Sequence, residues 1–202
     1  MVAVANLMTL SIHPRIAFFL AILCVPLLSQ TASTTPKSSS NAHLQALVDE
    51  DQRVRVGPPL APEEHARITR TDADRLAAVK KIIAANQLVT STDFRNAAIL
   101  LQHGSTSNDY LLSHTLAVIA ASKGDKTSVW LSAASLDRYL ISIKQPQIYG
   151  TQYNHFDPTK PWTQMPYNSD LISDAIRNEF GVPTLKEQKK EIDIDNSPPA
   201  AK

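Results

Sequence analysis

Residues 127–153, "TSVWLSAASLDRYLISIKQPQIYGTQY", decide the fold class. Up to Ile143 the apolar residues recur at alternating spacings of four and three, which is the repeat of one face of an α-helix. They are Val129, Ala133, Leu136, Leu140 and Ile143, and the serines 128, 132, 135 and 142 lie largely on the opposite face. The pattern predicts an amphipathic helix over 127–143.

The helical period stops at the segment that follows. Residues 145–167 contain Pro146, Pro158, Pro161 and Pro166, so this stretch cannot form one helix. It also holds five aromatic residues, which predict that the segment packs back onto the helices. Two short runs, 151–156 and 162–165, flank the turn "DPTK" and predict a short β-hairpin or ordered loop near residues 150–165.

Gly150 lies inside this segment, away from any helix end. We expect a positive φ there, where the chain leaves the long helix, and we expect Tyr149 and Tyr153 to pack the segment down. The alternative is that the tyrosines form an exposed binding site. Gly104, Gly124 and Gly181 are instead expected to close helices in the left-handed conformation.

Before and after this region the period is also helical. Helices are expected around 44–48, from Pro62, from a capping box at Thr71–Asp74, from a second box at Thr90–Asp93, over the apolar run 116–121, after Asn168, and over 184–191. The turns before 127 are short, so neighbouring helices should be antiparallel. The prediction is a mainly α fold, a small helical bundle with a repeat-like antiparallel middle.

The N-terminus has the order of a secretory signal peptide: Arg15, the uncharged apolar run 16–28, then small polar residues. The run is shorter than the roughly 20 residues that span a bilayer. We therefore predict a signal peptide over 1–32, a flexible tether over 33–41, a helical domain over 42–191 and a disordered tail over 192–202. The protein would be exported, to the periplasm or the extracellular space, with no membrane span after cleavage. The alternative is an uncleaved anchor.

Composition excludes several classes of function. The single cysteine, Cys24, lies in the predicted signal peptide, so the mature chain would have no disulfide and no thiol nucleophile. The 20 basic and 19 acidic residues form no basic stripe, which argues against nucleic acid as a partner. Five glycines and no Gly-rich motif argue against a nucleotide cofactor, and we expect no cofactor. His103 and His114 could approach each other, but no carboxylate accompanies them at metal-ligand spacing, so we expect no metal site.

Two residues could carry chemistry. Asp137 lies in line with the edge of the apolar face, and a buried carboxylate needs partners. We favour a structural role that holds the following segment to the helix; the alternative is a carboxylate with a shifted pKa at a cleft. His103 sits at a helix C-terminus. With Asp137 it could serve a hydrolase-like enzyme beside residues 147–153.

The preferred function is a binding or interaction module whose ligand is a protein, a peptide or a small molecule. The aromatic and amide-rich segment motivates this choice, together with the lack of a complete catalytic set. The expected binding residues are Arg138, Gln147, Tyr149, Gln152, Tyr153 and Trp162.

The motifs Gln102-His103-Gly104, Asp137-Arg138-Tyr139-Leu140, Pro146-Gln147, 149–152 and Pro161-Trp162 resemble those of a bacterial family known as a domain of unknown function. The resemblance covers roughly residues 42–190. It implies a mainly helical domain and no particular activity.

Overall fold

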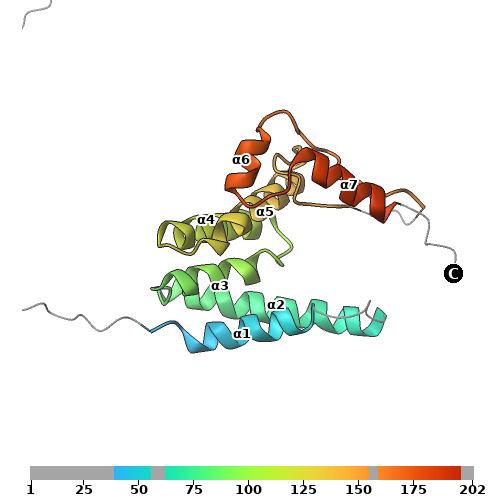
Figure 1. The fold of residues 1–202 in the computed structure, drawn as a ribbon. Helices are drawn as coiled ribbons and strands as arrows, with labels where there is room; N and C mark the ends of the chain where they lie inside the picture. The colour runs from blue at the N-terminus through green and yellow to red at the C-terminus, as the bar shows by residue number, and fades with distance from the viewer. Residues whose placement is uncertain (1–38, 56–61, 155–158, 197–202) are drawn as a thin grey trace, which may run out of the picture. The chain divides into compact units, whose positions relative to one another are not determined.

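The computed structural model describes residues 39–55, 62–154 and 159–196, and these belong to one compact unit (Figure 1). The helices are α1 (Ala42–Arg53), α2 (Pro62–Ala84), α3 (Ser91–Leu101), α4 (Ser107–Ser122), α5 (Thr127–Ser142), α6 (Asp174–Glu179) and α7 (Leu185–Asp195). No strand forms among the described residues. The predicted mainly α bundle is confirmed. The predicted signal peptide lies outside these ranges.

The first five helices build an apolar core. α3 packs on α1, α2 and α4, and α4 packs on α5, as the succession of ribbons in Figure 1 shows. Short connections at 102–106 and 123–126 reverse the chain between α3, α4 and α5. The core consists mainly of aliphatic side chains removed from water: Leu44, Val48, Val79, Ile82, Ala97, Ala98, Leu100, Leu101, Leu116, Ala117 and Leu131. None of the described helices is both long and apolar enough to cross a membrane.

Helix starts test the predicted caps. The box at Thr90 is confirmed, because the Thr90 hydroxyl accepts from the Asp93 amide and the Asp93 carboxylate accepts from the Thr90 amide. The box at Thr71 is wrong: α2 runs through it without a break, and the Thr71 hydroxyl donates to the Ile68 carbonyl at 2.8 Å. The sixth helix starts after Ser173, not after Asn168.

The two faces of α5 differ from the sequence pattern. Ser128, Ser132 and Ser135 are buried, whereas Ile143 of the apolar stripe is 41% exposed. Two of these serines bond back to their own helix: Ser132 Oγ donates to the Val129 carbonyl at 2.6 Å, and Ser135 Oγ to the Leu131 carbonyl at 2.7 Å. Small self-satisfied side chains let α4 pack closely on this face. The serine stripe of α5 therefore faces the interior of the protein.

The segment after α5 is an ordered loop. Its only ladder contacts within the described residues are two isolated bridges, Gln147 with Tyr167 and Asn154 with Thr163. The second confirms that the chain doubles back as the hairpin prediction required, although no strand extends from it. α7 then runs to Asp195, so it includes the first four residues of the predicted disordered tail, 192–195.

Gly150 has the predicted positive φ, +80°, but it does not turn the chain off α5. Lys144 does so: its φ is +61°, and the next backbone amide, that of Gln145, donates a hydrogen bond to the Leu140 carbonyl. A Cβ on Gly150 would lie 2.7 Å from the Tyr167 ring. Gly104, expected to be left-handed, has no positive φ; a Cβ there would lie 2.8 Å from Asp109 Cγ. Close approach therefore requires glycine at both positions, and backbone conformation adds to it only at Gly150.

Candidate functional site

Asp137 anchors the loop to α5. The side chain is fully buried, and its Oδ1 accepts from the amides of Ile148 at 2.8 Å and Tyr149 at 3.1 Å. Its Oδ2 accepts from the Thr151 amide at 3.0 Å and the Thr151 hydroxyl at 2.8 Å. Four donors compensate the buried charge, so the structural role preferred for Asp137 is confirmed.

Gln147 is the second anchor. It is fully buried, and its side-chain oxygen accepts from the Gln152 amide at 3.0 Å. Its side-chain amide donates to the carbonyls of Gln152 at 2.9 Å and Gln164 at 2.5 Å. All of its hydrogen-bonding capacity on these atoms serves the fold, so Gln147 is not exposed to a ligand.

Gln164 and Gln188 complete what we call the glutamine network, defined as Gln147, Gln164 and Gln188. Gln188, on α7, donates to the Tyr149 carbonyl at 2.9 Å and accepts from Gln164 at 3.1 Å. Gln164 donates in turn to the Gly150 carbonyl. The network ties the loop to α7 through buried, satisfied amides.

Tyr149 packs inside this region. It is 8% exposed, and its ring lies 4.8 Å, centroid to centroid, from that of Phe180. Burial raises the pKa of its phenol, and the nearby Asp137 charge adds to the rise. The structural role predicted for this tyrosine is confirmed, while Tyr153 is only half-buried and its hydroxyl donates to Glu191 Oε2 at 2.7 Å.

A pocket of about 420 Å³ opens on the other side of the loop. We call it the Arg138 pocket, and the residues that line it come from α4, α5 and the loop: Tyr110, Arg138, Ile141, Ser142, Gln152, Tyr153 and Asn154. Its volume lies in the range of small-molecule sites. Apolar surface from Ile141 and two tyrosine rings stands beside amide, hydroxyl and guanidinium groups.

The pocket contains hydrogen-bond donors without protein partners. Arg138 makes no hydrogen bond and no ion pair with any described residue, and its Nε is buried. The side-chain nitrogen of Asn154 is also buried without a partner. Gln152, in contrast, is committed: its amide donates to the Ala134 carbonyl at 3.3 Å and to the Thr151 hydroxyl at 2.9 Å. Arg138 Nε and the Asn154 side-chain nitrogen are both closed off from solvent, whereas the terminal nitrogens of Arg138 are not, so an acceptor in the hollow would meet Arg138 through its terminal nitrogens.

The electrostatic surroundings of Arg138 are not balanced by a carboxylate. Burial lowers its pKa; the charge of Arg55 lowers it further, and only the Tyr110 phenol opposes this. Arg55 itself is neutralised, at 2.8 Å from Asp51 and 2.7 Å from Asp72. Arg138 therefore contributes one uncompensated positive charge to the pocket wall.

His103 belongs to the same electrostatic neighbourhood but faces Asp51, with 3.6 Å between His103 Nε2 and Asp51 Oδ2. Burial, together with the charges of Arg55 and Arg138, lowers the pKa of His103 to about 4, against the opposing effect of Asp51. The ring is thus neutral at neutral pH. Asp137 binds the loop instead, so the two proposed catalytic residues serve different networks.

His114 is bonded to α5, with its Nδ1 2.9 Å from the Ser132 carbonyl. The His114 ring is thus hydrogen-bonded within the bundle. Within the ranges that the structure describes, no group of three His, Cys, Asp or Glu side chains could hold a metal ion.

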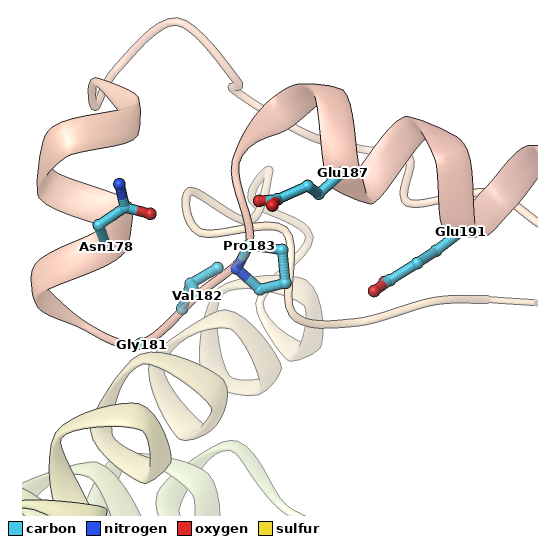
Figure 2. Close-up of a pocket in the computed structure, with 6 residues that line it drawn as sticks. All are labelled: Asn178, Gly181, Val182, Pro183, Glu187 and Glu191. Atoms are coloured by element: carbon cyan, nitrogen blue, oxygen red, sulfur yellow. The ribbon is translucent and has the colours of Figure 1, made fainter.

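A second hollow lies between α6 and α7, and Figure 2 shows Glu187 and Glu191 on successive turns of α7 with Pro183 and Val182 beneath them. It holds carboxylates and no cationic side chain. Glu187 is committed to the capping box of α7, accepting from the Thr184 amide at 2.8 Å and hydroxyl at 2.7 Å. Its polar groups therefore serve the helix end, and the Arg138 pocket is the stronger candidate site.

The structure separates the six predicted binding residues into three sets. Arg138, Gln152 and Tyr153 line one pocket, while Gln147 and Tyr149 are buried in the fold. Trp162 contacts the end of α7, with its amide and carbonyl bonded to the Asn196 side chain at 2.6 and 3.1 Å. Sequence reasoning missed Tyr110 and Asn154. Tyr110 could have been found, because a short turn between antiparallel helices brings the start of α4 beside the end of α5.

Comparisons of the chain with protein families, with curated proteins and with solved structures find no match. The resemblance to a bacterial domain of unknown function stays a prediction. The site itself must therefore carry the functional argument.

Proposed function

We propose that this protein is an exported binding module that holds a small ligand in the Arg138 pocket. The observation that carries the proposal is Arg138, a cation that lines the hollow and has no hydrogen-bond or ion-pair partner among the described residues. A buried donor without an acceptor costs about 1–3 kcal/mol. A ligand that supplies the acceptor would recover that free energy on binding.

The hydrolase-like alternative gains no support from the described residues. Asp137 has no exposed surface and both carboxylate oxygens are occupied by the loop. His103 faces Asp51, and no hydrogen bond among the described residues joins it to Asp137, so the two do not form an acid–base pair. A rigid pocket wall built by anchored residues fits binding better than proton transfer.

The pocket can be tested by filling it. Ser142 lies at its rim, and its hydroxyl bonds only to its own helix, donating to the Tyr139 carbonyl at 2.6 Å. Ser142→Trp should occupy the hollow with little loss of stability. A fragment panel containing neutral and anionic compounds, followed by amide chemical shifts, should give hits that perturb residues 110, 142 and 154 in the wild type and not in the variant.

Ser122→Trp is the matched control. Ser122 ends α4 as Ser142 ends α5; it is exposed and its hydroxyl donates to the Ile119 carbonyl at 2.8 Å. This variant should keep every hit. The proposal fails if no fragment shifts the pocket amides, or if Ser142→Trp and Ser122→Trp bind alike.

Export rests on the signal-like order of residues 15–33 and is tested separately. Mass spectrometry of protein recovered outside the cytoplasm should show a chain that starts near Ala32 or Ser33. A recovered chain that still carries Ile16 to Leu28 would argue for a membrane anchor.

A further inference from the structure

The geometry points to a monocarboxylate as the ligand of the Arg138 pocket, carried on an apolar group about the size of one ring. This inference rests on the proposed binding function and names the class of ligand. It follows from the charge, the donor geometry and the apolar surface of the pocket, taken in turn.

Charge comes first. Arg138 is the one cation among the residues that line the pocket, and no described carboxylate pairs with it. The neighbouring Arg55 is held between Asp51 and Asp72 and is thereby neutralised. One free positive charge matches one negative charge on the ligand. A dianion would leave a second charge without a partner in a half-buried site.

Donor geometry favours a planar acceptor. A guanidinium presents its N–H groups as a flat fork, which matches the two oxygens of a carboxylate. Asn154 lines the same hollow. No acidic side chain is among the residues that line the pocket, and the Tyr153 hydroxyl donates outside this set, to Glu191 Oε2 at 2.7 Å.

The rest of the wall is suited to an apolar body. Ile141 and the rings of Tyr110 and Tyr153 line the pocket beside the guanidinium. At about 420 Å³ the hollow admits a small molecule, because ligand sites run from roughly 300 to 1,000 Å³. Benzoate has the required features: one carboxylate and one ring.

The test compares benzoate with benzamide, its neutral isostere, and with inorganic phosphate. Titrations of the purified protein are followed by amide chemical shifts and by calorimetry. Benzoate should perturb residues 110, 142 and 154 and bind at least tenfold tighter than benzamide, while phosphate should bind more weakly than benzoate. Raising the salt concentration should weaken the binding of benzoate and leave the binding of benzamide unchanged, since only benzoate forms an ion pair.

Two variants locate the charge. Arg138→Met keeps the length and the apolar stem, so it should bind benzoate and benzamide equally. Arg138→Lys keeps the charge without the fork and should show an intermediate preference if the Met variant does not fold. Arg95→Met is the control: Arg95 lies on α3, outside the pocket wall, and should retain the wild-type preference.

The outcomes separate the two proposals. Equal binding of benzoate and benzamide, lost in Ser142→Trp, would overturn the carboxylate assignment and leave the binding function standing. A benzoate preference that survives Arg138→Met would also overturn it. Absence of binding by these three probes overturns the carboxylate assignment, and absence of any hit in the fragment panel overturns the binding function as well.

Discussion

The two halves of this molecule are held together by different forces. Around α1–α4 a cluster of aliphatic side chains, with Leu44, Leu101 and Val79 fully removed from water, dominates the interior, and polar side chains such as Asp51 and Asp93 are buried there as well. Around the loop and α7 the interior is largely polar, with Asp137, Arg177 and the glutamine network buried at its centre. Burial of apolar area is non-directional and tolerates small changes of packing. Buried polar groups instead depend on every partner being present, so the second region is specified by geometry.

The largest expected effect comes from removing the loop anchor. Asp137→Ala deletes an acceptor for three backbone amides and one hydroxyl, and should destabilise the protein by about 4 kcal/mol, since unsatisfied buried donors cost roughly 1–3 kcal/mol each. Urea unfolding measures the loss. Hydrogen exchange should show that protection falls mainly in the loop, α6 and α7, while α1–α4 remain protected.

Leu101→Ala provides the comparison in the apolar core. It should cost about 3 kcal/mol, within the usual range for a buried leucine, and lower protection across α1–α4. Asp49→Ala, on the exposed face of α1, should change stability by less than about 0.5 kcal/mol. If Asp137→Ala lowered protection uniformly through both regions, the division between them would be wrong.

The pH dependence should also divide the two regions. The pKa of His103 is about 4 in the folded protein and near 6.5 in the unfolded chain, so only the unfolded chain binds this proton between those values. Stability should therefore fall as pH drops from 6.5 to 4, by about 3 kcal/mol in total. The charged groups that act on the pKa of the ring are Arg55, Asp51, Arg138 and Asp72, and Asp51 faces its Nε2 at 3.6 Å.

His103→Gln removes the group that binds this proton. The plot of unfolding free energy against pH should therefore be flatter between pH 6.5 and 4. His43→Gln, at an exposed position of α1, is the control and should follow the wild type. Carboxylates with a lowered pKa, such as Asp72 and Asp93, lose their contribution only below their ordinary value near 3.8, outside this window. Parallel curves for His103→Gln and the wild type would contradict the prediction.

A smaller effect is expected at Gly150. An alanine there would take a strained positive φ and place its Cβ against the Tyr167 ring, so Gly150→Ala should cost about 2 kcal/mol. Gly124→Ala is a useful control, because its φ is +98° but no atom lies within 4 Å of the added Cβ. It isolates the backbone cost. Equal losses at the two positions would show that the close approach at Gly150 is easily relieved.

This division between the halves also explains what the sequence could predict. The periodic spacing of apolar residues predicted helices throughout 44–143, although it divided α2 in two, and the local Thr90–Asp93 pattern predicted a cap, because each depends on neighbours along the chain. The capping box predicted at Thr71 is wrong because the helix continues through it. Within that helix Arg75 forms an ion pair with Asp72 at 2.7 Å. The buried serine face of α5 was missed because a serine that bonds to its own helix behaves as a small residue.

The candidate site was only partly predictable. Arg138, Gln152 and Tyr153 were all predicted to bind a ligand, and they do line one pocket, with Arg138 on α5 and the other two in the loop. Gln147 looks the same in sequence yet is fully buried, because the direction of an amide depends on partners up to Gln164 and beyond. The residue types in the sequence indicated the region of the site. Only the three-dimensional contacts show which of these residues anchor the loop and which line the pocket.

The bond from Gln188 to the Tyr149 carbonyl, across 39 positions of the chain, has a consequence for biosynthesis. Translation proceeds from the N-terminus, and α1–α5 can bury their aliphatic faces before α7 has been made. The carbonyls of Tyr149 and Gly150 must stay hydrated until Gln188 and Gln164 arrive. The part of the pocket wall that the loop supplies, residues 152–154, is thus fixed among the last steps, and a chain that ends before residue 188 would hold a folded bundle with an unfinished site.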